Sequence, residues 1–225
     1  MALLEIDAGE LDDEPEELYA LADWVHVACG GHAGDEASMT RVVEACKRLG
    51  TGIGAHPSYV DREGFGRRAM NVAPEVLEAQ IASQLEALRD VCTKADVPIG
   101  SMKPHGALYH RANDDDATAR ACLAATRRIL GDVMIVASSG GGLERVAKAM
   151  GLPFLREAFA DRGVRADGSL VPRGEPGAMI VDPEDAADRA RVLVRSYDAI
   201  CVHGDTEGAI AIARAVRFAL GPRRG

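Results

Sequence analysis

The chain alternates short runs of apolar and β-branched residues with longer helical patterns from one end to the other, which constrains the fold more than any other feature. Seven of the short runs predict strands, namely Leu3–Ala8, Trp24–Cys29, Thr51–Ala55, Ile99–Lys103, Val133–Ala137, Phe154–Glu157 and Ala199–Val202. Strands joined through helices pair in parallel, with right-handed crossovers. A closed barrel and a doubly wound open sheet of the α/β class both satisfy this pattern.

Three helices stand out between these strands. Over Pro74–Ala95 apolar residues recur at spacings of three and four, and a proline suits the first turn. Asp35–Leu49 begins at an acidic residue and is followed by Gly50, and both are typical of helix ends. The acidic run at residues 114–116 predicts the capped start of a helix that ends near Leu130.

The chain is predicted to form a single domain over residues 1–225, because no stretch rich in Pro, Gly and Ser divides it. With 47% apolar and 27% charged residues it can bury a full core, which excludes a disordered scaffold. Ala158–Val181 is a long polar segment without clear periodicity, and such segments in compact enzymes are usually site loops or lids.

Charge and local composition exclude several classes of protein. Lys and Arg total 26 against 35 Asp and Glu, and the net charge of −9 argues against a nucleic-acid partner. No run approaches about 20 apolar residues, and the start lacks the regions of a signal peptide, so we expect a cytoplasmic protein with no membrane partner. Five cysteines without CxxC spacing predict buried thiols rather than disulfides or a zinc knuckle.

Four of the six histidines follow directly on a predicted strand, each beside Gly or Pro: His32, His56, His105 and His203. The carboxyl ends of parallel strands share one edge of the sheet, where ligand sites form. One such histidine is usually structural, whereas four at the same edge predict a common functional site.

Acidic side chains are expected at the same edge. They are Asp7, Glu10, Asp35, Glu157, Asp161 and Asp205. A carboxylate beside an imidazole fixes its tautomer and raises its basicity, which suits a general base or a metal ligand. Asp35 and Asp205 also precede helical patterns, so helix capping is the alternative for these two residues.

Cationic side chains near this edge are candidates for binding anions. Lys103 ends a strand, where either burial lowers its pKa or a substrate oxyanion pairs with it. Arg67 and Arg68 lie on a glycine-rich loop, and Arg162 and Arg173 lie on the long polar segment. Arginine forks bind carboxylates and phosphates, and the alternative for each of these arginines is a solvated surface position.

Well-known cofactor and catalytic motifs are absent. The chain has no GxxxxGK[ST] P-loop for ATP and no GxGxxG between a strand and a helix. GxSxG and HExxH are also missing, which excludes the usual serine hydrolases and zincins. The glycine-rich stretch Ser138–Gly142 is a weak candidate for an anion-binding nest of backbone amides.

The chain contains, in this order, the segments IDAGE, ACGGHAGDEASM, GIGAHPSYVDREGFGRRAM, MKPHGALYH, EAFADR, DGSLVPR and CVHGDT. Together they resemble the LamB/YcsF family, which holds the A subunit of prokaryotic 5-oxoprolinase, from about Leu4 to Leu220. The resemblance implies a (β/α)7-type barrel related to the glycoside hydrolase/deacetylase barrels. It also implies an ATP-dependent hydrolase that opens the lactam 5-oxo-L-proline (pyroglutamate) to L-glutamate.

The resemblance also implies partners, because the family shares its reaction with separate 5-oxoprolinase B and C subunits. These subunits would phosphorylate the lactam oxygen, so that the complex consumes ATP and this chain hydrolyses the activated intermediate. The missing P-loop fits such a division of labour. The oligomeric state is open, and a homo-oligomer is one option.

The family motifs assign site residues one by one to this sequence. The residues with a catalytic assignment are Asp7, Glu10, His32, His56, Lys103, His105, Glu157, His203 and Asp205. Those assigned to substrate binding are Asp35, Arg67, Arg68, Tyr109, Asp161, Arg162 and Arg173. The combined set predicts general acid–base catalysis beside a wall that binds anions.

The chain departs from the family pattern near the expected substrate wall. Glu5 and His26 stand where the family has Asn, Gly31 where it has Phe, and Val164 where it has Tyr. The loop at Leu11–Glu16 and the region before the last strand are shortened. We therefore expect the chemistry to be retained and leave the exact substrate open.

Two other functions stay open. One is a metal-dependent, deacetylase-like C–N hydrolase in which Asp7, His56 and His105 hold a divalent ion at adjacent strand ends. The other is a non-catalytic paralogue that keeps the barrel as a binding or assembly subunit, since part of the substrate wall is lost. The four strand-end histidines argue against the second alternative.

Overall fold

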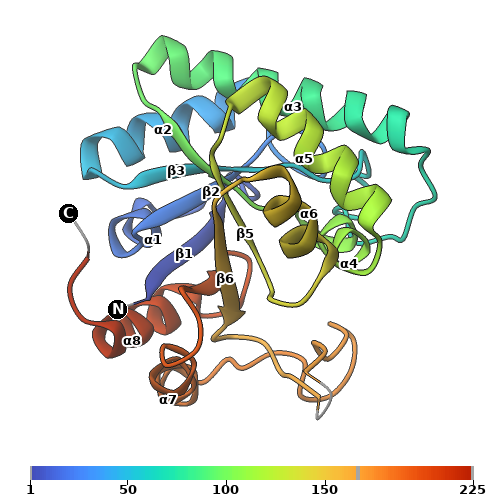
Figure 1. The fold of residues 1–225 in the computed structure, drawn as a ribbon. Coiled ribbons are helices and arrows are strands. Elements are labelled where there is room, and N and C mark those ends of the chain that lie inside the picture. The colour runs from blue at the N-terminus through green and yellow to red at the C-terminus, as the bar shows by residue number, and fades with distance from the viewer. Residues whose placement is uncertain (1, 166–167, 224–225) are drawn as a thin grey trace.

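The protein is a closed parallel barrel in the computed structural model, which describes residues 2–165 and 168–223 (Figure 1). Its strands are β1 (Leu3–Ala8), β2 (Trp24–Ala28), β3 (Gly52–His56), β4 (Ile99–Met102), β5 (Met134–Ala137), β6 (Phe154–Phe159) and β7 (Ala199–His203). β1 pairs with both β2 and β7, which closes the sheet. The seven predicted strands are confirmed, and the architecture is the barrel rather than the open sheet.

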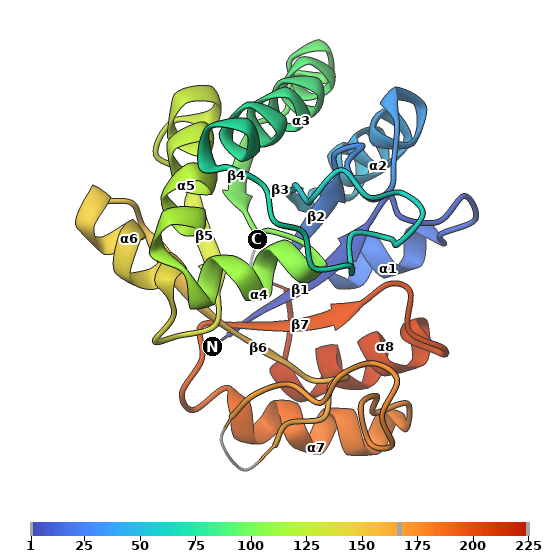
Figure 2. The ribbon, with the colours of Figure 1, turned by 90° about the vertical axis from the view of Figure 1, so that its right-hand side faces the viewer.

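Helices cover the outside of the barrel (Figure 2). In chain order they are α1 (Glu16–Leu21), α2 (Glu36–Leu49), α3 (Pro74–Ala95), α4 (Gly106–Asp114), α5 (Asp116–Leu130), α6 (Gly142–Met150), α7 (Pro183–Leu193) and α8 (Ala209–Leu220). Asp35 caps α2 by accepting a hydrogen bond from Ser38 N, as its acidic start predicted. Asp115 follows the last residue of α4 and caps α5, so the acidic run joins the two helices and the predicted capped start is confirmed.

The two faces of the strands differ in chemistry. In β1, Ile6 belongs to the apolar core that the helices cover, whereas Glu5 and Asp7 alternate with it. The ammonium of Lys103, directly after β4, reaches Asp7 of β1 and Glu157 of β6, so these side chains meet inside the barrel. Barrels of this kind usually hold branched apolar residues there, whereas this one holds charged groups.

Long connections follow two of the strands at their carboxyl ends. The connection from β3 to α3 holds residues 57–73, and the one from β6 to α7, orange in Figure 1, holds residues 160–182. The predicted polar segment Ala158–Val181 covers most of the second connection, although Ala158 and Phe159 continue β6. Among the helices that the structure describes, none is long and apolar enough to cross a membrane.

Candidate active site

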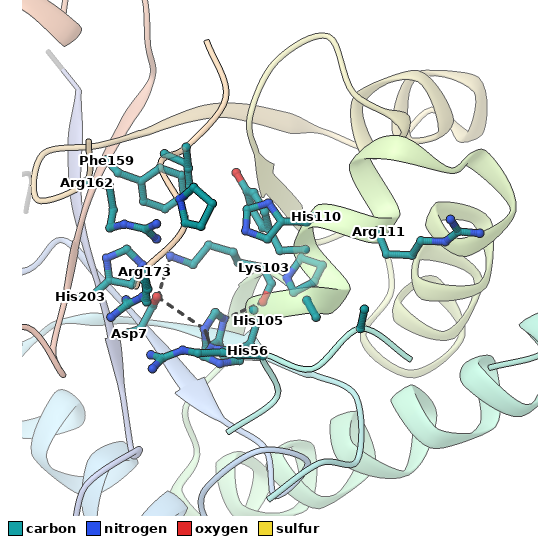
Figure 3. Close-up of a pocket in the computed structure, with 18 of the residues that line it drawn as sticks. Asp7, His56, Lys103, His105, His110, Arg111, Phe159, Arg162, Arg173 and His203 are labelled. Carbon is teal, nitrogen blue, oxygen red and sulfur yellow. Dashed lines mark hydrogen bonds and ion pairs between the residues drawn. The ribbon is translucent and has the colours of Figure 1, made fainter. Parts of the chain in front are cut away.

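Most of the predicted site residues meet in one pocket at the carboxyl ends of the strands, with a volume of about 620 Å³ (Figure 3). The predicted residues that line it are Asp7, His56, Arg67, Lys103, His105, Tyr109, Arg162, Arg173 and His203. Glu10, His32 and Asp35 line a second cavity of about 200 Å³. Three of the four strand-end histidines thus meet in one pocket, whereas His32 lines the second cavity.

The ammonium of Lys103 is the centre of the polar interior. It lies 2.6 Å from Asp7 Oδ1 and 2.8 Å from Glu157 Oε1, and it donates to Cys201 Sγ at 3.2 Å. Burial by itself lowers the pKa of Lys103, but Asp7, Cys201 and Glu157 raise it by more, to well above its usual value. The predicted alternative of a lowered lysine pKa is wrong, because anionic partners outweigh the loss of water.

Glu157 connects this centre to α4. Its second carboxylate oxygen accepts a hydrogen bond from the Tyr109 hydroxyl at 2.9 Å. The same hydroxyl accepts one from the Ser138 amide at 2.6 Å, and the Gly140 amide donates to Glu144. Two amides of the predicted anion nest at Ser138–Gly142 are thus occupied by groups of the chain itself.

Two buried polar residues, Glu5 and His26, lie beneath the centre and were not among the predicted site residues. Burial raises the pKa of Glu5 well above its usual value, and the charge of Glu157 raises it further. His26 Nε2 lies 3.0 Å from Ser101 Oγ, and its Nδ1 lies 4.0 Å from Glu5 Oε2. The alternation of β1, which puts Glu5 on the same face as Asp7, was the signal that could have placed Glu5 inside.

His203 and Asp161 form an acid–histidine pair at the end of β7. Asp161 Oδ1 lies 3.0 Å from His203 Nδ1, and Thr206 Oγ1 donates to Asp161 Oδ2 at 2.7 Å. Burial lowers the pKa of His203, but the charge of Asp161 and its hydrogen bond raise it by more. The His203 ring also stacks on Phe159, with centroids 5.4 Å apart. The imidazole is therefore held in place and readily protonated.

The other three strand-end histidines gather around Glu10, and we call His32, His56, His105 and Glu10 the histidine cluster. Glu10 Oε1 lies 2.9 Å from His32 Nε2 and 3.2 Å from His105 Nδ1. The rings of His32 and His105 stack in parallel at 3.6 Å. Burial lowers the pKa of His56 to about 3, so this imidazole is neutral. A second group of metal-ligand type, Asp7 with Cys201 and His203, lies beside the cluster among the described residues.

Arginines form one wall of the pocket, opposite His110 and Arg111 of α4 (Figure 3). Arg67 Nη2 lies 2.5 Å from Asp205 Oδ2, and Arg173 Nη2 lies 3.3 Å from Asp205 Oδ1. Arg162 donates to backbone carbonyls of the β6–α7 connection. Asp205 thus holds two arginines in position, and it does not cap α8, whose N-cap is Gly208.

The pocket differs in detail from the predicted set. Arg68 does not line it, and the Arg68 guanidinium lies at the surface, 3.6 Å from Asp61 Oδ1. His110 and Asp114 do line it and were not predicted. The spacing of four residues between them places both on one face of α4, which was a usable signal.

Comparisons with known proteins agree over nearly the whole chain. The sequence model of the LamB/YcsF family matches residues 7–223. The A subunit of 5-oxoprolinase from Streptomyces griseus is 43% identical over 238 residues, covering 96% of this chain and 94% of that protein. The protein of the same name from Heliobacterium modesticaldum is 40% identical, with 91% and 86% covered.

Two solved structures have a similar fold. A lactam utilization protein from Thermus thermophilus matches with a TM-score of 0.90 and 35% identity, covering 97% of this chain and 95% of that one. A family 4 carbohydrate esterase from Streptomyces lividans, in complex with acetate, has a TM-score of 0.57 and 12% identity, with 97% and 86% covered. At that identity the esterase shows a likeness of fold alone.

Replacement of Lys103 by Met should destabilise the barrel. The change leaves the buried carboxylates of Asp7 and Glu157 without their shared cation, which costs about 3–5 kcal/mol of unfolding free energy. Chemical denaturation measures this loss. The matched control is Lys94→Met, because Lys94 pairs with Glu36 at the surface and should unfold like the wild type. Equal stability of the two variants would contradict a central role for Lys103.

The Asp161→Asn substitution should lower the pKa of His203, since it removes the charge that raises it. A raised histidine pKa stabilises the folded state below the unfolded-state value of about 6.5, and this contribution is lost as the pH rises through the folded-state pKa. The stability difference between wild type and variant should therefore shrink as the pH rises. Histidine NMR titration and denaturation at several pH values measure both effects. An unchanged His203 pKa would refute the pairing.

Proposed function

The chain belongs to the LamB/YcsF family, and from this membership we propose that it is the A subunit of a 5-oxoprolinase, a hydrolase that opens the cyclic amide of 5-oxo-L-proline to give L-glutamate. One observation carries the proposal: a single pocket contains an ionised acid, an acid–histidine pair and an arginine wall. Hydrolysis of a lactam carboxylate needs these three groups, namely a base, a proton donor and an anion site.

The arginine wall is the proposed site for the substrate carboxylate. Arg67 and Arg173 are held by Asp205, so their guanidinium groups are positioned before a substrate enters. Arg162 lies close enough to both for their charges to lower its pKa, after the larger effect of burial. A bound carboxylate would relieve this repulsion, which favours an anionic ligand at this wall.

The proposed proton transfers involve Asp7 and His203. Burial raises the pKa of Asp7, but its cationic surroundings, with the Lys103 ammonium at 2.6 Å, lower it by more, so the carboxylate is ionised and can accept a proton. Asp7 would take a proton from water while the water oxygen bonds to the ring carbon that carries the phosphorylated lactam oxygen. His203 would give a proton to the ring nitrogen as the carbon–nitrogen bond breaks, while Asp161 holds the imidazole. A second water would then hydrolyse the resulting acyl phosphate to the glutamate carboxylate and inorganic phosphate.

Lys103 and Glu157 have a positioning role in this proposal. The ammonium already contacts three groups of the chain, which leaves it no free hydrogen for a substrate oxyanion. It keeps Asp7 in place and compensates its charge. Glu157 links this ion pair to Tyr109, a residue of the pocket wall.

The proposal extends to partners and cofactors. The relatives are named as one lettered subunit of an enzyme, and this name implies an assembly of several subunits. We propose that the partners are the 5-oxoprolinase B and C subunits, which consume ATP to phosphorylate the lactam oxygen in the cytoplasm. A divalent cation, as a second cofactor, would act as a Lewis acid on an oxygen of the phosphorylated lactam.

Reconstitution tests this function. The purified chain is combined with B and C subunits, 5-oxoproline and ATP, and glutamate formation is measured. Loss of the proton donor in His203→Gln should reduce kcat by about 10²–10⁴-fold. No glutamate above background, with B and C subunits that are active when combined with their own A subunit, would end the lactam assignment.

Arg173→Gln tests the carboxylate site. Loss of a charged hydrogen bond of about 1.5–3 kcal/mol corresponds to a KM raised roughly 10- to 100-fold, with a smaller effect on kcat. Arg165→Gln is the matched control, because Arg165 belongs to the same connection but pairs with Glu175 at the surface. Steady-state kinetics of the reconstituted complex separate the two parameters. A KM that rises equally in both variants would contradict a specific site at Arg173.

A further inference from the structure

We propose that the histidine cluster is a binding site for one divalent metal ion of the zinc type, with Glu10, His32, His56 and His105 as its ligands. A catalytic role for the ion rests on the proposed function, whereas the site itself follows from the contacts of this chain. One atom of each of the four side chains lies within 4.8 Å of the others.

Two ring nitrogens of the cluster, His56 Nε2 and His105 Nδ1, face each other, and with both rings neutral no hydrogen lies between them. His56 Nδ1 lies 2.8 Å from the Lys103 carbonyl oxygen, and His105 Nε2 lies 2.9 Å from the Phe65 carbonyl oxygen. A carbonyl only accepts, so these two nitrogens carry the hydrogens and the neutral rings have lone pairs on His56 Nε2 and His105 Nδ1. Those lone pairs are 3.0 Å apart. A positively charged species between them is needed to turn this contact into an attraction.

Among the residues that the structure describes, no hydrogen-bond donor lies near His56 Nε2. Besides His105, its neighbours are Asp7 Oδ2 at 3.5 Å and Glu10 Oε1 at 3.9 Å, both carboxylate oxygens. The lone pair of His56 Nε2 is thus buried among atoms that can only accept hydrogen bonds. A cation is the group that all of these atoms can bind at once.

The spacing of the donor atoms fits a metal of this size. Zinc binds imidazole nitrogen at about 2.0–2.1 Å, so two ligand atoms of a tetrahedral zinc site lie roughly 3.3 Å from each other. Glu10 Oε1 lies 2.9 Å from His32 Nε2 and 3.2 Å from His105 Nδ1. A shared proton would join two of the atoms, whereas here four atoms converge.

The outer contacts are also those of ligating histidines, which normally donate their second ring nitrogen to a carbonyl or carboxylate. His56 and His105 do so to backbone carbonyls. His32 Nδ1 is buried without a hydrogen-bond partner among the described residues, so no contact there prevents the His32 ring from presenting an Nε2 lone pair. Its parallel stack on His105 points both rings toward the same Glu10 oxygen.

This ligand set differs from the one predicted from the sequence, where Asp7 joined His56 and His105. Asp7 Oδ1 lies 2.6 Å from the Lys103 ammonium, which already compensates its charge. The same ammonium contacts Cys201 and therefore disfavours a cation at the group formed by Asp7, Cys201 and His203. Glu10, which has no lysine or arginine partner among the described residues, is the better anionic ligand.

The histidine cluster lies between the two cavities, so an ion and a substrate could reach it from opposite sides. His56 and His105 line the larger pocket, at its floor in Figure 3, whereas Glu10 and His32 line the smaller cavity. The smaller cavity is also lined by Asp12, Asp35 and Arg62, so its carboxylates outnumber its one arginine and favour cation entry. An ion in the cluster would thus lie in the wall between the two cavities and beside the base Asp7.

Zinc binding to the stripped protein tests this site without any substrate or partner. The purified chain is treated with a chelator, returned to chelator-free buffer and titrated with zinc sulfate in a calorimeter. We expect one zinc per chain and a higher melting temperature with zinc. Glu10→Gln and His32→Ala should each weaken binding by about 100-fold or more.

Two controls define the ligand set. His110→Ala removes a histidine of the same pocket that lies outside the cluster, and Asp7→Asn removes the carboxylate of the alternative set. Both should keep one zinc with less than about a tenfold change in affinity. Circular dichroism establishes that each variant is folded.

Failure of the metal site and failure of the lactam function are distinguishable, because binding is measured without catalysis. A folded wild-type chain that binds no zinc would overturn the site and leave a shared proton between His56 and His105. Binding that survives in His32→Ala and Glu10→Gln but is lost in Asp7→Asn would overturn the ligand set.

Discussion

The buried ammonium of Lys103 is the interaction on which the rest of the site depends. It joins Asp7 of β1, Glu157 of β6 and Cys201 of β7 from the end of β4, so one cation connects strands on different sides of the barrel. Without it, two carboxylates would be buried with no counter-charge. With it, the pKa of Asp7 stays low despite burial, and the pocket keeps an ionised acid.

Because the interior of the barrel is polar, the two faces of the sheet contribute differently to stability. The helix-covered face carries the apolar core, for example Leu4 and Ile6 of β1, and supplies the hydrophobic stabilisation. The inner face carries groups that are costly to bury, such as Glu5 and His26. The barrel can hold these groups only because its outer face is packed with apolar side chains on every side.

Much of the fold and part of the site could be predicted from the sequence. The strand-end positions of His56, His105 and His203 follow from local patterns, because parallel strands bring their carboxyl ends together. The alternation of β1 indicated the inner face for Glu5, but the approach of Glu5 to His26 depends on the register between β1 and β2. Arg68 was predicted at the site because it shares a glycine-rich loop and a family motif with Arg67, yet its guanidinium lies at the surface.

The sequence by itself determined the alternation of strands and helices, the family and the residue types available at one edge of the sheet, because these are encoded over a few neighbouring residues. The tertiary structure decided the ionisation of Lys103, the use of the Ser138 amide and the grouping of Glu10 with three histidines. These properties depend on which distant groups come within a few ångströms of one another, and closure of the barrel alone sets those distances.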